Sequence, residues 1–199
     1  MSDLIFREKD HVYLLDGVKL PCVSDLCRFL HREIYKEVPA WQMENAALRG
    51  TAVHTATQAL DDAGSCDIAE EYLPYVQAYK AFLQEHSVSW QMTEKALYHP
   101  VYRYAGTIDR YGAVDDLLTL VDIKTTYTVY KPLCRAQLNL YRLMLAARGY
   151  AVDRLCILHL QRTGKYRLIT IDFDEVLPRA LITLHSALLK RKRKGGNYV

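Results

Sequence analysis

The stretch GTIDRYGAVDDLLTLVDIKTT, residues 106–126, decides the fold because it reads as two β-strands joined by a turn at the Asp-Asp dipeptide. In an antiparallel pair turned there, Asp109 faces Asp122, with β-carbons roughly 5 Å apart on one face of the sheet. Facing carboxylates repel, and one tends to hold a proton unless a cation lies between them. Lys124, two residues beyond Asp122, projects from the same face. Two carboxylates and an ammonium therefore converge, and a divalent metal is the simplest occupant.

This placement depends on the turn. A four-residue loop keeps the same pairing, whereas a loop with an odd number of residues would shift it. A purely structural arrangement also fits the sequence, in which Asp122 and Lys124 form a local ion pair at the margin of the sheet. Asp109 then pairs with Arg110 or Arg103. Polar residues elsewhere in the chain must decide between a site and this alternative.

The helix that follows the two strands carries polar side chains on an otherwise apolar face. Positions at i, i+3 and i+4 spacing read Leu133, Gln137, Leu140, Tyr141 and Met144. A buried amide costs stability unless it is hydrogen-bonded, so Gln137 needs a partner beneath the helix. Tyr141, one turn further on, directs its hydroxyl to the same space beneath the helix. The two are either a hydrogen-bonded core pair or part of a site.

His54 lies in an upstream stretch, residues 41–60, whose Ala, Leu, Gln and Glu content favours a helix. Gly50, four residues earlier, permits close approach to a neighbouring element. Taken alone, the histidine is a core residue, a surface residue or a ligand. Glu94, at the start of the strand before the aspartates, is either an outer carboxylate or second-metal ligand, or an exposed acid at a strand end.

The remaining pattern predicts an α+β or mixed α/β chain around one central sheet. Asp16-Gly17 is typical of a tight hairpin turn near the N-terminus, and Ser24 can cap a helix. Further helices are expected at 70–86, at 132–147 and at the C-terminal end, and strands at 92–98, 101–114, 118–125 and on both sides of Thr163-Gly164. No repeat or linker is visible, so residues 1–199 are expected to form one domain.

Positive charge is concentrated in a C-terminal tail. Five of the 26 basic residues form one run, and the rest of the chain has 21 basic against 23 acidic residues. The run consists of Lys190, Arg191, Lys192, Arg193 and Lys194. This chain has no uniformly basic coat, so a polyanion would be bound through a local groove and the tail, residues 190–199. If the tail contacts the phosphates of a nucleic acid, trimming it weakens the affinity and flattens its salt dependence; a solvated helix end is the alternative.

Composition also limits compartment and cofactors. The N-terminus lacks an apolar signal core and no apolar run approaches the roughly 20 residues of a membrane span, so a cytoplasmic, membrane-free protein is expected. The five cysteines are odd in number, scattered and without a Cys-x-x-Cys pair, which favours buried thiols over disulfides or zinc. No Walker A motif is present, so no ATP site is expected.

Together these residues resemble the ordered motifs of the PD-(D/E)XK nuclease superfamily, in particular its RecB-like exonuclease branch and compact, stand-alone phage or prophage exonucleases. The matching motifs are RGTAVH with His54, GTIDR with Asp109, VDIKTT with Asp122 and Lys124, and QLNLY with Gln137 and Tyr141. Each motif is short, but six positions in the expected order and on the expected elements are specific together. The resemblance implies a restriction-endonuclease-like core, a central mixed β-sheet flanked by helices in αβββαβ order.

The resemblance further implies a metal centre. Asp109 and Asp122 would coordinate Mg²⁺ or Mn²⁺, with the backbone carbonyl of Ile123 and with His54 as further ligands. A histidine among oxygen ligands makes Mn²⁺ more plausible than in an all-oxygen site. Some relatives hold an iron–sulfur cluster through C-terminal cysteines, but no cysteine follows Cys156, so no such cluster is expected.

The same resemblance assigns roles around the metal. Lys124 would position or activate the attacking water, and Gln137 and Tyr141 would arrange the substrate end. Phosphodiester hydrolysis requires stabilised charge on phosphate oxygens and hydroxide near neutral pH, and a divalent cation contributes to both. A pKa lowered by the metal would let Lys124 accept a proton.

The leading hypothesis is a metal-dependent deoxyribonuclease acting on DNA ends, as an exonuclease in recombination, repair or phage DNA processing in a bacterial or phage-infected cell. DNA is the implied partner; a recombination partner such as a single-strand annealing protein and a homo-oligomer are compatible with the resemblance. The alternatives are an endonuclease of the same fold, a non-catalytic DNA-binding or assembly module on this scaffold, and an unrelated α+β domain with structural charges.

Overall fold

A small antiparallel sheet opens the chain in the computed structural model, which describes residues 3–194 apart from the side chains of Glu8 and residues 190–194. It contains β1 (Leu4–Arg7), β2 (Val12–Leu15) and β3 (Val18–Leu20), with a 3-10 turn, η1 (Glu8–Asp10), between the first two. The predicted hairpin turn at Asp16-Gly17 is confirmed, and both residues have positive φ angles. The sheet lies against the central sheet, where the Tyr13 hydroxyl is 2.9 Å from Thr107 Oγ1.

The central sheet has five strands in the order β4-β5-β6-β7-β8. They are β4 (Val88–Tyr98), β5 (Ala105–Val114), β6 (Leu117–Lys124), β7 (Arg154–Leu160) and β8 (Tyr166–Ile171). Every pair is antiparallel except β6 and β7, which are parallel because helix α5 (Lys131–Ala146) carries the chain back across the sheet. This mixed sheet flanked by helices confirms the predicted fold class and the αβββαβ order.

The hairpin of β5 and β6 has the predicted register. Val114 pairs with Leu117 and Arg110 with Val121, around a turn in which Asp115 and Asp116 both have positive φ. Regular pairing ends at Arg110. At the next position a side chain replaces the main-chain hydrogen bond between the strands, because Asp109 Oδ2 accepts a hydrogen bond from the Ile123 amide at 2.7 Å. The two strands therefore separate where the charged residues lie.

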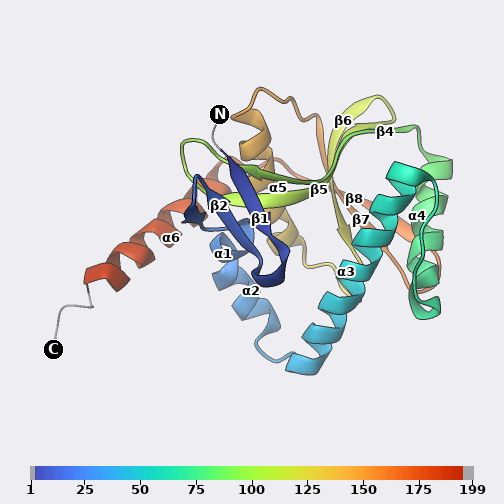
Figure 1. The fold of residues 1–199 in the computed structure, drawn as a ribbon, viewed down its shortest axis with the longest axis horizontal. Helices are drawn as coiled ribbons and strands as arrows, with labels where there is room; N and C mark the ends of the chain where they lie inside the picture. The colour runs from blue at the N-terminus through green and yellow to red at the C-terminus, as the bar shows by residue number, and fades with distance from the viewer. Residues whose placement is uncertain (1–2, 195–199) are drawn as a thin grey trace.

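Helices cover both faces of the central sheet (Figure 1). Helices α3 (Ala40–Ala63) and α4 (Leu73–Glu85) pack on one face, with a 3-10 turn, η2 (Glu70–Tyr72), between them; their buried residues include Val53, Leu60 and Phe82. Helices α1 (Val23–Leu26), α5 and α6 (Val176–Lys194) pack on the other face. Helix α2 (Arg28–Tyr35) connects α1 to α3. Figure 1 shows α6 leading away from the sheet towards the C-terminus.

Several local predictions were wrong. Ser24 is not a cap, because it lies inside α1, whose N-cap is Cys22 with Asp25 accepting its amide hydrogen bond at 3.1 Å. Strand β1 and helix α2 were not predicted, and residues 101–104 form a turn instead of a strand start. Gly50 does not serve a close approach, because nothing lies within 4 Å of the place where a β-carbon would be.

Two compositional expectations concern the membrane and the thiols. No helix in the part of the chain that the structure describes is long and apolar enough to cross a membrane. All five cysteines are free, and four of them, Cys22, Cys27, Cys134 and Cys156, are buried, as the sequence predicts, whereas Cys66 is half-buried.

Candidate metal centre

His54 on α3, Glu94 on β4 and Asp109 on β5 meet at one point of the sheet. His54 Nδ1 lies 3.0 Å from Glu94 Oε1 and 3.8 Å from Asp109 Oδ1, and His54 Nε2 lies 3.3 Å from the Ile123 carbonyl oxygen. One donor atom from each of the three side chains lies within 4.8 Å of the others. Such a group of imidazole and carboxylate donors can hold a divalent cation.

Helix and strand geometry bring these side chains together. His54, Thr57 and Asp61 are spaced i, i+3 and i+7, so they follow one face of α3, the face that contacts β4 and β5. Glu94 has a φ of +42° in the middle of β4, a left-handed conformation that costs of order 1 kcal/mol or more outside glycine. Its carboxylate reaches α3 and β5 from there, so the strained backbone is held by the contacts of the site.

Glu94 is thus not an exposed acid at a strand end. Strand β4 begins at Val88, earlier than the sequence predicts, so Glu94 lies in its middle, and its side chain is 20% exposed. The alternative that pairs the carboxylate of Asp109 with Arg110 is also wrong. Arg110 donates to the main-chain oxygen of Asp109 at 2.7 Å and directs its remaining bonds to other residues.

Asp122 and Lys124 form the neighbouring part of the site on β6. Lys124 Nζ lies 2.7 Å from Asp122 Oδ2, but no hydrogen bond with suitable angles reaches that buried oxygen. The ion pair of the structural alternative therefore exists. It lies on the central strand of five and beside Asp109, however, and not at the margin of the sheet.

Burial and the neighbouring charges together set the protonation of the centre. Burial raises the pKa of both aspartic acids, Asp109 and Asp122, and the charges of His54 and Lys124 offset it only in part. Burial disfavours the charged form of His54, but Asp109 and Glu94 outweigh it and raise its pKa to about 9. The pKa of Lys124 is raised too, because Asp122 and Asp109 outweigh its burial. Without a metal, protons supply the positive charge that the site requires.

Gln137 and Tyr141 both lie on α5, and Tyr141 lies near Asp109 and Asp122. Gln137 Oε1 is buried and has no hydrogen-bond partner among the described residues, so the expected partner beneath the helix is not a protein atom there. Tyr141 packs on Gly106, where an added β-carbon would stand 2.7 Å from its Cε1. Burial and the charges of Asp109 and Asp122 raise the pKa of Tyr141 well above its usual range, so its hydroxyl stays protonated.

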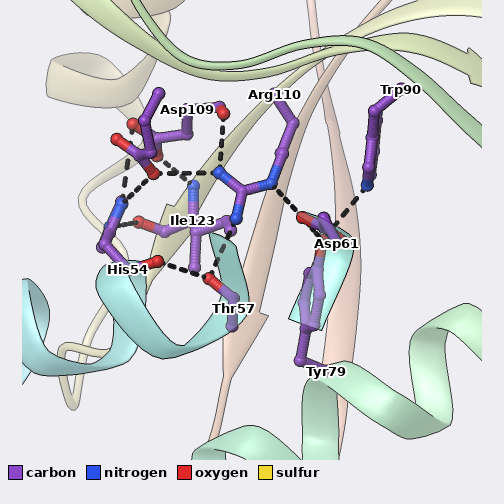
Figure 2. A network of polar contacts seen from close by, with 9 residues as sticks. His54, Thr57, Asp61, Tyr79, Trp90, Asp109, Arg110 and Ile123 are labelled. Carbon is purple, nitrogen blue, oxygen red and sulfur yellow. Dashed lines mark hydrogen bonds and ion pairs between the residues drawn. The ribbon is translucent and has the colours of Figure 1, made fainter. Parts of the chain in front are cut away.

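Behind His54, a buried network of polar side chains connects α3, α4, β4 and β5 (Figure 2). Arg110, which is fully buried, forms ion pairs with Asp61 at 2.7 Å and Glu94 at 2.9 Å. Asp61 in turn accepts hydrogen bonds from the Tyr79 hydroxyl, which accepts one from Trp90 Nε1 at 3.2 Å. Sequence reasoning missed Asp61, Thr57, Tyr79 and Trp90. The helical spacing of Thr57 and Asp61 after His54 was the available signal for two of them.

The residues fit a divalent cation. Four carboxylates, those of Asp61, Glu94, Asp109 and Asp122, face two permanent cations, Arg110 and Lys124, which leaves two uncompensated negative charges when His54 is neutral. Buried like charges are unfavourable unless a counter-charge is bound.

The proposed DNA-binding run lies at the limit of the structure. Helix α6 extends to Lys194, but the side chains of residues 190–194 and all of residues 195–199 lie outside the described part of the chain. Phosphate contacts by the tail therefore stay a prediction.

The raised pKa of His54 makes a prediction for the metal-free protein. Because protonation of His54 stabilises the fold, its contribution is complete below pH 6.5 and is lost as pH rises through about 9. In EDTA, the Tm should fall between pH 6.5 and 9, and His54→Gln should flatten that slope. Thermal unfolding followed by circular dichroism measures both; an equal slope in the variant would assign the pH dependence to other groups.

Comparison with known proteins gives structural likenesses but no sequence match. No known protein family matches the chain, and no curated protein matches its sequence. A solved structure, an alkaline exonuclease (LHK-Exo) from Laribacter hongkongensis, aligns at 17% identity with a TM-score of 0.43, over 87% of this chain and 90% of that one. A likeness this slight assigns neither family nor activity, so function has to be argued from the site.

Proposed function

We propose that the chain is a divalent-metal-dependent deoxyribonuclease that hydrolyses phosphodiester bonds, acting as an exonuclease at DNA ends. The observation that carries the proposal is the convergence of His54, Asp109 and the Ile123 carbonyl from three separate elements, with Asp122 and Lys124 beside them. The motif order that resembles RecB-like nucleases supports the same reading.

The cation is Mg²⁺ or Mn²⁺, held by His54, Asp109, Asp122 and the Ile123 carbonyl, with Glu94 as an outer carboxylate. Carboxylate and carbonyl oxygens suit both ions, and an imidazole ligand favours Mn²⁺ over Mg²⁺. The two uncompensated negative charges of the centre support one divalent ion per chain. When bound, such an ion polarises the phosphate and lowers the pKa of a bound water.

The chain's own residues complete the chemistry. Lys124 keeps its proton beside Asp122, so it acts as an ammonium that orients the attacking water or a phosphate oxygen. The free carbonyl of Gln137 accepts a hydrogen bond from that water or from the DNA end. Tyr141 has a protonated hydroxyl, which donates to substrate oxygens.

Cleavage assays with wild-type protein test the proposal. We expect Mn²⁺ and Mg²⁺ to support digestion of end-labelled linear DNA, duplex or single-stranded, and EDTA to stop it. A covalently closed circle should stay intact, and the released label gives the direction of digestion.

Other outcomes separate the alternatives. Nicking or linearisation of the closed circle would favour an endonuclease of the same fold. Metal binding and DNA binding without cleavage would favour a non-catalytic DNA-binding or assembly module. Linear DNA left intact, with no stabilisation by metal, would contradict the proposal.

A further inference from the structure

The guanidinium of Arg110 is held on three sides behind the candidate metal centre (Figure 2). Nε donates to Asp61 Oδ2 at 2.7 Å, Nη1 to Glu94 Oε1 at 2.9 Å, and Nη2 to Thr57 Oγ1 at 3.1 Å. Nη1 also donates to the main-chain oxygen of Asp109. Because every nitrogen has an oxygen partner, the guanidinium cannot turn without breaking several hydrogen bonds.

This arrangement fixes one oxygen of Glu94 in particular. Glu94 Oε1 accepts from Arg110 Nη1 and lies 3.0 Å from His54 Nδ1, so a single oxygen is shared by two nitrogen groups. A buried arginine on that oxygen repels a metal ion there. The oxygen is therefore better suited to accept the Nδ1 proton of His54 than to bind a cation.

The other nitrogen of His54 faces a candidate ligand. Nε2 lies 3.3 Å from the Ile123 carbonyl oxygen, and when Nδ1 carries the only proton these two atoms are both acceptors. Adjacent ligands of an octahedral Mg²⁺ or Mn²⁺ ion, each bound at about 2.1 Å, are about 3 Å apart. The pair is thus spaced as two neighbouring ligands of one ion would be.

We propose that Glu94 and Arg110 are positioning residues: Arg110 fixes the Glu94 carboxylate, which takes the Nδ1 proton of His54 and leaves Nε2 to bind the metal. This inference rests on the proposed function, since it needs a cation at the centre. Carboxylates commonly orient metal-bound histidines in this way, and removing the carboxylate typically weakens the metal 10- to 100-fold. Glu94 then shapes the site without being a ligand.

Variants of both residues test the assignment. Mn²⁺ affinity is measured by calorimetry in wild type, Glu94→Gln, Arg110→Lys and the double variant. We expect each single variant to weaken Mn²⁺ binding about 10-fold or more without abolishing it. The double variant should be about as weak as the weaker single one, since both changes act on one contact. Arg154→Lys is the matched control, an arginine on β7 bound to Thr119 Oγ1 and the Val114 carbonyl, and should leave the affinity unchanged.

A second readout separates positioning from general loosening. In Mg²⁺-loaded protein with ¹⁵N-labelled histidine, His54 should show a protonated Nδ1 and a metal-bound Nε2, and Glu94→Gln should reduce that preference. Thr57→Val covers the case in which Arg110→Lys fails to fold. It removes the Nη2 acceptor and the hydrogen bond that Thr57 Oγ1 donates to the His54 main-chain oxygen, and it should weaken Mn²⁺ binding a few-fold.

Three results would overturn the inference. The first is a metal ion bound to His54 through Nδ1. The second is complete loss of Mn²⁺ binding in Glu94→Gln, as loss of a ligand would cause. The third is an Mn²⁺ affinity within twofold of wild type both in Glu94→Gln and in the Arg110 or Thr57 variant. They leave the proposed function standing, whereas a wild type that binds no metal removes both.

Discussion

Replacing Asp109 by asparagine should reduce metal-dependent DNA cleavage by on the order of 10²–10³-fold or more, the loss seen when a charge-stabilising group is removed from an active site. Asp109 is the carboxylate at which α3, β4 and β5 converge, 3.8 Å from His54 Nδ1. Asparagine keeps the size of the side chain, and its amide oxygen can still accept the hydrogen bond from the Ile123 amide. The fold should therefore survive while the negative charge that attracts the cation is lost.

Folding and cleavage are measured on the same preparation. Asp153→Asn is the matched control, because this exposed aspartate accepts a hydrogen bond from the Leu118 amide outside the site and should leave cleavage unchanged. Asp109→Asn protein that folds, binds Mn²⁺ and cleaves at wild-type rates would place the chemistry elsewhere in the chain.

Replacing Gly112 by alanine should cost about 3 kcal/mol or more of unfolding free energy, at or above the upper end of overpacking losses. Gly112 lies on β5 opposite the β-bulge of β4, and an added β-carbon would stand 2.7 Å from Trp90 Cα and 2.9 Å from the Gln91 amide nitrogen. These are backbone atoms, which cannot move aside as a side chain can. Urea unfolding should show a lower midpoint, and Mn²⁺ binding should weaken too, because β4 carries Glu94.

Gly50→Ala provides the opposite expectation. Gly50 lies within α3 with nothing within 4 Å of an added β-carbon, so alanine should stabilise the protein by about 0.5–1 kcal/mol.

An unchanged urea midpoint in Gly112→Ala would contradict the tight contact of β4 and β5 at the bulge.

The sequence predicted those parts of the fold that local rules determine. The turn at Asp115-Asp116 set the register of β5 and β6, and alternation then fixed which charged residues share a face. Gly149, just after α5, and Gly164, in the turn between β7 and β8, have positive φ angles. Local sequence alone predicts them, because glycine adopts such angles without steric cost. Short elements such as β1 and α2 were missed, because their stability comes from packing more than from pattern.

The candidate site was only partly predictable. Motif residues such as His54 and Asp109 could be found one at a time, because each departs from the apolar pattern of its element. Glu94 was misplaced, since its left-handed backbone and the bulge before it depend on contacts across β4 and β5. The Asp61–Arg110–Glu94 ion pairs join residues 16 and 49 positions apart, and no spacing rule relates them.

The most direct test of the central claim, that His54 and the neighbouring carboxylates hold a catalytic cation, is the magnetic resonance spectrum of Mn²⁺ bound to the protein. We predict one Mn²⁺ per chain with a ¹⁴N coupling from a directly bound imidazole, a coupling that His54→Gln removes. Tightly bound Mn²⁺ without that coupling, or a coupling that survives His54→Gln, would contradict the account.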